Sequence, residues 1–146
     1  MFLRALPPFL MLLSLPAVAQ DASCSLTGGA ETCVPVHACV VEKALWFEGS
    51  AYGSREGRIE GAMSDGTLCT GSWEVRGILG MGRSDIACDD GLKARIWYTY
   101  LDGRTGTAVG TGRSNTEERI NAWSGANYRD YLRSQDKAPE LSCFKG

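Results

Sequence analysis

The sequence predicts a mainly β fold: a small antiparallel β-meander that can curl into a barrel, followed by a short C-terminal helical segment and stapled by disulfides. Short runs rich in β-branched and aromatic residues lie between residues 43 and 113. Gly-containing turn signals separate them at about ten-residue spacing, which is typical of consecutive antiparallel strands. All six cysteines and all 18 glycines of the 146-residue chain lie beyond residue 20. This length and composition fit a single disulfide-held domain.

The first 19 residues have the organisation of a secretory signal peptide. A short basic start ending at Arg4 precedes an apolar stretch that reaches Leu15, and Ala17 and Ala19 supply the small side chains of a cleavage site. The apolar stretch is about half of the roughly 20 residues that a membrane-spanning helix needs. We therefore expect cleavage after Ala19. Residues 20–146 would then be one periplasmic or secreted domain without stable membrane insertion.

The even number of cysteines in an exported chain indicates three disulfides. Metal ligation is the weaker interpretation, because the chain has no Cys-x-x-Cys motif and its single histidine, His37, cannot complete the spacing of a zinc site. We therefore expect neither a metal nor another cofactor. All six cysteines are interpreted as structural, namely Cys24, Cys33, Cys39, Cys69, Cys88 and Cys143.

Residues 20–42 are expected to form an irregular arm, because they hold half of the cysteines, the Gly28-Gly29 pair and Pro35 without a clear hydrophobic period. The meander, residues 43–113, follows. Asp-Gly pairs at 65–66, 90–91 and 102–103 mark three of its joints, where hairpin turns favour the positive φ that Asp and Gly adopt. The six expected strands are Lys43–Tyr52, Arg58–Ser64, Thr67–Val75, Leu79–Ala87, Leu92–Leu101 and Thr105–Arg113.

Residues 114–135 are expected to be helical. The segment from Ser114 to Glu117 has the S-x-x-E form of a capping box, in which the Ser hydroxyl and the Glu carboxylate each bind a free backbone N–H. Ile120 and Trp123 lie three residues apart, and a second helical stripe begins at Tyr128. We expect two short helices or one kinked helix that covers the sheet.

Two registers are possible between the strands that carry Cys69 and Cys88. A turn at Arg76-Gly77 sets Trp73 opposite Gly80 but leaves the two cysteines too far apart for a disulfide. A turn at Ile78-Leu79 brings them face to face, and we favour it because unpaired cysteines in neighbouring strands of an oxidised protein are unusual. The other four cysteines allow three pairings, of which Cys24–Cys33 with Cys39–Cys143 best ties down both ends, including a tail at residues 136–146.

A glycine-arginine segment occurs twice, as GMGRSD at residues 80–85 and GTGRSN at residues 110–115. In a functional interpretation, the glycines let a ligand approach the backbone while Arg83 and Arg113 bind its anionic group. In a structural interpretation, the glycines make room for an aromatic side chain of a neighbouring strand. The two interpretations differ in whether a ligand is needed.

Strand register favours the structural interpretation. A two-residue turn at Asp102-Gly103 places Trp97 diagonally over Gly110 and sets Tyr98 on the face that carries Val109. This arrangement fills the space above the glycine without a ligand.

The charge and motif content of the chain reduce the number of function classes to be considered. Loss of Arg4 with the signal leaves 14 basic and 17 acidic residues, a net charge of −3, and no basic run that would bind nucleic acid. We expect a non-enzymatic exported binding or accessory protein whose partner is a protein or glycan of the cell envelope. Its candidate binding residues combine charge with flat aromatic surfaces: Arg83, Arg113, Trp97 and Trp73.

Two alternatives stay open. A small secreted hydrolase would use His37, whose ordinary pKa suits proton transfer at neutral pH, or a pair of carboxylates about 5 to 10 Å apart. No Gly-x-Ser-x-Gly motif is present, and the available carboxylates are Glu48, Glu56, Glu60 and Glu74. The second alternative is a structural envelope component, for which disulfides and short strands suffice.

Overall fold

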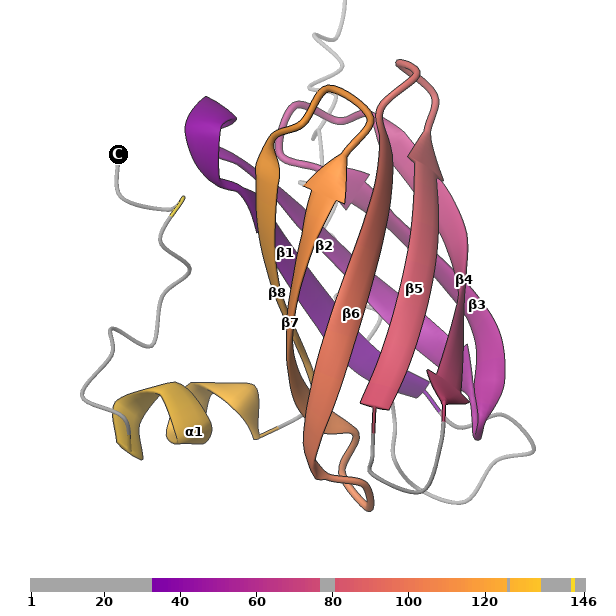
Figure 1. Ribbon diagram of the computed structural model, residues 1–146, viewed down its shortest axis with the longest axis vertical. Helices are drawn as coiled ribbons and strands as arrows, with labels where there is room; N and C mark the ends of the chain where they lie inside the picture. The colour runs from indigo at the N-terminus through magenta and orange to yellow at the C-terminus, as the bar shows by residue number, and fades with distance from the viewer. Residues whose placement is uncertain (1–32, 77–80, 126, 135–142, 144–146) are drawn as a thin grey trace, which may run out of the picture.

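The computed structural model describes residues 33–76, 81–125, 127–134 and 143, and these form a closed antiparallel barrel of eight strands with one short helix outside its wall (Figure 1). Each strand pairs with its neighbours in the sequence, and the first pairs with the last to close the barrel. The strands are β1 (Cys33–Val40), β2 (Leu45–Gly53), β3 (Glu56–Met63), β4 (Leu68–Arg76), β5 (Met81–Cys88), β6 (Lys93–Asp102), β7 (Thr107–Ser114) and β8 (Arg119–Ser124). A 3-10 turn, η1 (Val41–Lys43), links β1 to β2, and the helix is α1 (Tyr128–Ser134).

The mainly β prediction is confirmed, and each of the six expected strands matches one of β2 to β7 with both ends within two residues. The alternation of side chains explains this agreement. In β6, for example, Ala94, Ile96 and Tyr98 are buried inside the barrel, whereas Arg95 and Trp97 face outwards. Such a period of two is the property of a half-buried strand.

The expected irregular arm is wrong for its later part, because residues 33–40 form β1. Val36, Ala38 and Val40 alternate into the core. The strand tolerates Pro35 because the backbone groups of this residue point towards β8 and not towards β2. The Pro35 carbonyl accepts a hydrogen bond from the N–H of Gly125 (2.9 Å), which lies just beyond the end of β8. The missing proline N–H therefore removes no ladder bond to β2. Residues 20–32 of the expected arm lie outside the described residues.

The expected helical segment at residues 114–135 is also wrong over most of its length. Residue 114 ends β7, residues 119–124 form β8, and the helix begins at Tyr128. Ile120 is buried in the barrel, whereas Trp123 points to its outside. Their spacing of three places these side chains on opposite faces of a strand, so the helical period was misleading.

The S-x-x-E segment closes a three-residue hairpin loop between β7 and β8. The backbone N–H of Ser114 donates to the carbonyl of Glu118 (3.0 Å), and Glu117 has a left-handed backbone with φ 66°. The Ser114 hydroxyl accepts from the N–H groups of Thr116 (3.2 Å) and Glu118 (3.1 Å). The side-chain-to-backbone bonds that cap a helix can thus close a hairpin instead.

Glu118 lies where this loop meets η1. Its carboxylate is 2.6 Å from the ammonium of Lys43, and the hydroxyls of Thr116 and Ser114 also donate to it. These interactions lower the pKa of Glu118 to about 2. The interaction with Lys43 contributes most, followed by the hydrogen bonds from the two hydroxyls. The folded protein therefore favours the ionised form of this carboxylate.

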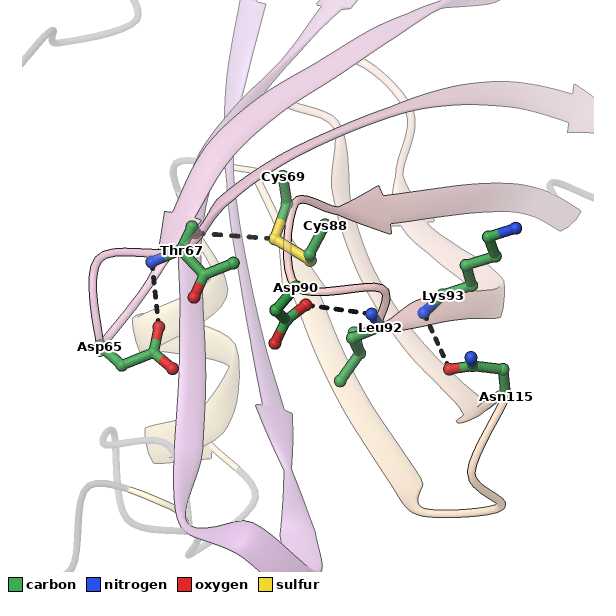
Figure 2. Close-up of a disulfide and its surroundings, with 8 residues drawn as sticks. All are labelled: Asp65, Thr67, Cys69, Cys88, Asp90, Leu92, Lys93 and Asn115. Atoms are coloured by element: carbon green, nitrogen blue, oxygen red, sulfur yellow. Dashed lines mark hydrogen bonds between the residues drawn. A yellow bond between two sulfur atoms is a disulfide. The ribbon is translucent and has the colours of Figure 1, made fainter.

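Two of the Asp-Gly joints have the same loop geometry. Gly66 and Gly91 take the left-handed position with φ of 90° and 94°, and the carboxylates of Asp65 and Asp90 each accept a backbone N–H two residues later at 3.0 Å (Figure 2). At the third joint Asp102 pairs with Thr107, so four residues, 103–106, lie in the loop instead of the expected two. The prediction of turns at these joints is confirmed, but the two-residue turn at Asp102-Gly103 is wrong.

The longer loop corrects the expected register of β6 and β7. Trp97 lies opposite Thr111 and Tyr98 lies opposite Gly110, with a register shift between Tyr100 and Asp102. Because the register differs from the expected one by an odd number of residues, the faces are exchanged. Gly110 lies beside Tyr98 inside the barrel, and Trp97 is 45% exposed on its outside.

One end of the barrel is tightly packed around the Cys69–Cys88 disulfide (Figure 2). These two cysteines are direct partners in the β4–β5 register, which confirms the favoured pairing, and Trp73 accordingly lies opposite Ser84. The turn at residues 77–80 lies outside the described residues. Apolar side chains around the disulfide, including Phe47 and Ile120, leave a void of only about 20 Å³.

The second expected disulfide, Cys39–Cys143, is also confirmed and joins the C-terminal region to the outer face of β1. Trp46 and Trp123 pack against it. Cys33 is disulfide-bonded too, and its expected partner Cys24 lies outside the described residues, as do the signal peptide and most of the tail. No helix within the described part of the chain is long and apolar enough to cross a membrane.

Candidate functional site

The end of the barrel opposite the Cys69–Cys88 disulfide contains a cavity of about 500 Å³. The β2–β3 turn and the β6–β7 loop border it, at the lower end of the barrel in Figure 1. An eight-stranded barrel is just wide enough for side chains to fill its interior or for one small ligand to be held there. This barrel is filled at one end and hollow at the other.

The walls of the cavity are mainly apolar and aromatic. They come from five strands, so the closed barrel is needed to bring them together. The apolar and aromatic lining residues are Val34 and Val36 of β1, Ala51 of β2, Ile59 of β3, Trp73 and Val75 of β4, and Tyr98 and Tyr100 of β6.

Tyr98 lines the cavity and carries a buried hydroxyl. The residue is 6% exposed, and its hydroxyl is fully enclosed by the protein beside the hydroxyl of Ser84. Burial raises the pKa of Tyr98 to about 12, although the nearby Ser84 hydroxyl opposes this shift. At neutral pH the phenol is therefore protonated, and its ring rather than its enclosed hydroxyl forms part of the cavity wall.

The repeated glycine segments make room for the two cavity tyrosines. A Cβ added at Gly110 would lie 2.8 Å from Tyr98 Cδ1, and one at Gly82 would lie 2.6 Å from Tyr100 Cε2. Both distances are too short for a real side chain. The structural interpretation of the repeat is thus supported, with Tyr98 and Tyr100 in the role that we had expected for Trp97.

Two arginines lie at the rim of the cavity. Among the described residues that line the cavity, these two are the charged ones. Arg55 comes from the β2–β3 turn, is exposed and forms no ion pair with a described residue. Arg104 comes from the β6–β7 loop, has a side chain that is 94% exposed and lies 3.7 Å from the carboxylate of Asp102. The rim is therefore positively charged.

The outer wall of β4 to β6 carries a second arrangement of functional groups. Arg83 lies 3.1 Å from both Glu74 and Asp85, and Asp85 also pairs with Arg95 at 2.6 Å. The Nε of Arg83 is not aligned for a hydrogen bond with Asp85. Its guanidinium lies 5.9 Å from the ring centroid of Trp97, within the range of a cation–π contact.

The four residues predicted for binding are therefore divided between two surfaces. Arg83 and Trp97 lie together on the outer wall, and Arg113 lies on the same side of the barrel, opposite Arg95. Trp73 points into the cavity, where its indole N–H donates to the carbonyl of Tyr52 (2.8 Å). Trp73 also lines, together with Arg83, a hollow of about 450 Å³, but Trp97 and Arg113 are not part of its lining.

The residues considered for hydrolysis are located on the outer wall. His37 packs against the ring of Tyr128 in α1 at 4.8 Å and lies 3.8 Å from Glu48. Glu56 and Glu74 are direct cross-strand partners, and Glu74 is held by Arg76 (2.6 Å) and by Arg83. The Glu74 carboxylate is thus held in ion pairs with the protein's own arginines rather than presented to a substrate.

No group of three or more His, Cys, Asp or Glu side chains within the described residues could hold a metal ion.

Comparison with solved structures finds designed β-barrels. The redesigned barrel mFAP1, bound to DFHBI, matches with a TM-score of 0.51 and 16% sequence identity over 64% of this chain and 91% of that chain. A de novo designed fluorescence-activating β-barrel matches with a TM-score of 0.49 and 16% identity over 64% of this chain and 89% of its own. At this identity the likeness concerns the fold alone. No protein-family model and no curated protein matches the sequence.

Sequence reasoning missed most of the cavity. The alternation in β6 places Tyr98 on the same face as Ala94 and Ile96, but nothing in the local pattern shows that this face encloses a space. Arg55 and Arg104 occupy turn positions, where an arginine is ordinarily a solvated side chain. Their common location could be recognised only once the ends of β2 and β6 were known to meet.

Proposed function

We propose that the protein is a non-enzymatic binding protein that holds a small, largely apolar molecule in the hollow end of its barrel. The observation that carries this proposal is the cavity of about 500 Å³. Ligand pockets commonly measure about 300 to 1,000 Å³ and combine apolar walls with a few polar groups. Trp73, Tyr100 and the apolar residues supply the walls, and Arg55 and Arg104 supply polar groups at the rim.

The size of the cavity limits the ligand. At the roughly 30 Å³ that a water molecule occupies in the liquid, a volume of about 500 Å³ accommodates about 17 non-hydrogen atoms. A single aromatic system of two or three rings, or a medium-length alkyl chain, has this size. A folded peptide or an oligosaccharide of several units is too large.

We also propose that this binding takes place outside the cytoplasm, after removal of the signal at Ala19. The Cys39–Cys143 and Cys69–Cys88 disulfides support an oxidising compartment. The charged outer wall, with pairs such as Arg95–Asp85, supports a location outside the bilayer, because membrane-spanning barrels carry an apolar outer band.

The proposal is tested with the neutral fluorescent reporter N-phenyl-1-naphthylamine and a variant that fills the cavity. Val75→Trp adds an indole to the cavity wall and should weaken reporter binding about tenfold or more, whereas Thr70→Trp adds the same group to the exposed side of the same strand, β4, and should change it less than about twofold. Ala51→Leu fills the cavity from another strand and guards against a folding defect in one variant. Equal binding by wild type and both cavity variants would refute the proposal.

A second candidate function uses the outer wall near the hollow end. Met81, Trp97 and Leu101 are 47%, 45% and 44% exposed and belong to the adjacent strands β5 and β6. Such exposed apolar groups beside Arg83 suit contact with a protein or glycan of the cell envelope. The cavity variants leave this patch unchanged, so the reporter assay concerns the first candidate alone.

A further inference from the structure

We propose, on the basis of the proposed function, that the ligand is an amphipathic anion. Its apolar chain or ring system occupies the cavity, and its carboxylate, or an anionic group of similar size, lies at the rim between Arg55 and Arg104. This assigns a charge and an orientation to the bound molecule. Two independent features of the protein support the assignment.

The first feature is the sign of the charge around the cavity. The whole chain has a net charge of −2, yet both charged residues among the described cavity lining are arginines. Charged side chains of one sign at the mouth of a low-dielectric cavity attract ligands of the opposite charge. A neutral ligand would gain nothing from this arrangement.

The second feature is that the rim arginines are bound less closely by the protein's own carboxylates than other arginines are. On the outer wall, Arg58, Arg83 and Arg95 each lie within 3.1 Å of a carboxylate of the protein. Arg55 has no such partner among the described residues, and Arg104 is 3.7 Å from Asp102. A guanidinium group presents paired N–H donors that match the two oxygens of a carboxylate.

The geometry also avoids an energetic penalty. A charge buried in the apolar part of the cavity would lose its hydration at high cost. Because Arg104 is almost fully exposed and Arg55 is exposed, an anionic group at the rim keeps contact with water while its apolar part leaves water. The hydrophobic contribution and the ionic contribution can therefore be measured separately.

The test compares decanoate with 1-decanol, which have the same chain length and differ in charge, as competitors of N-phenyl-1-naphthylamine at low ionic strength. Decanoate should bind about 2- to 30-fold more tightly than 1-decanol, the range that two exposed ion pairs supply, and added salt should reduce this preference. The Arg55→Gln/Arg104→Gln variant should lose the preference and retain its affinity for 1-decanol.

The matched control is Arg119→Gln/Arg133→Gln, which removes two exposed positive charges that do not line the cavity. It should keep the preference for decanoate. If 1-decanol and the reporter bind but decanoate binds no more tightly, or if the preference survives in the rim variant, this inference is wrong while the proposed function stands. If neither competitor nor the reporter binds the wild type, the proposed function itself fails.

Discussion

Removal of the Cys69–Cys88 disulfide by Cys69→Ala/Cys88→Ala is expected to lower the free energy of unfolding by about 3 to 4 kcal/mol. The two cysteines are separated by 19 positions, and a cross-link over this distance reduces the entropy of the unfolded chain by the equivalent of about 3.2 kcal/mol at 25 °C. Both cysteines are buried, at 2% and 9% exposure, so the small void left by alanine adds up to about 1 kcal/mol.

Guanidinium chloride unfolding, followed by tryptophan fluorescence, measures this loss. The midpoint should fall, and the slope should rise because the unfolded chain becomes less compact. The melting temperature should fall by about 10 to 15 °C. Reporter binding well below the transition should stay within about twofold of the wild-type value, because the disulfide lies at the packed end and the cavity at the other.

The control is Cys39→Ala/Cys143→Ala. This bond spans 104 positions, for which the same relation gives about 4.7 kcal/mol. Its removal should therefore cost about 1.5 kcal/mol more than removal of Cys69–Cys88, before packing is considered. A loss below about 1 kcal/mol for the Cys69–Cys88 variant, or a midpoint that does not move, would refute the reasoning from loop closure.

Two further predictions concern a glycine and a carboxylate. Gly110→Ala should destabilise the protein by about 1 to 3 kcal/mol in thermal unfolding, because the new Cβ would lie 2.8 Å from Tyr98 Cδ1. The control Gly103→Ala should have little effect, because a Cβ at this position meets no atom within 4 Å. Equal effects of the two would contradict the close packing. The pKa of Glu118 is lowered from 4.5 to about 2, so its stabilising contribution is present above about pH 4.5 and is lost as the pH falls towards 2. Unfolding measured across this range should show a shallower acid dependence in Glu118→Gln, and an unchanged slope would exclude this role.

Strand positions could be predicted from the sequence because the signals are local. The alternation in β6, for example at Ile96 and Trp97, reports which side chains face the interior. The Asp-Gly joints report where the chain reverses, since Asp accepts a nearby backbone N–H and Gly adopts the left-handed conformation. The same alternation is visible in β1, but the cysteines and Pro35 concealed it.

Other features could not be predicted because one local sequence is compatible with two structures. The S-x-x-E segment at Ser114 makes similar hydrogen bonds in a helix cap and in a hairpin loop. The spacing of Ile120 and Trp123 suits one face of a helix, yet β8 is held as a strand by its pairing with β1 and β7. Tertiary hydrogen bonds decided these cases.

By itself, the sequence determined the mainly β class and six of the eight strands, and it favoured the Cys69–Cys88 and Cys39–Cys143 pairings without excluding others. The tertiary structure alone decided that the sheet closes, through pairs such as Val36 with Ser124, and which face of β7 lies inside. It also decided where the cavity lies. These properties depend on loop lengths and on contacts between distant residues, and a change of one residue in register exchanges the two faces of a strand.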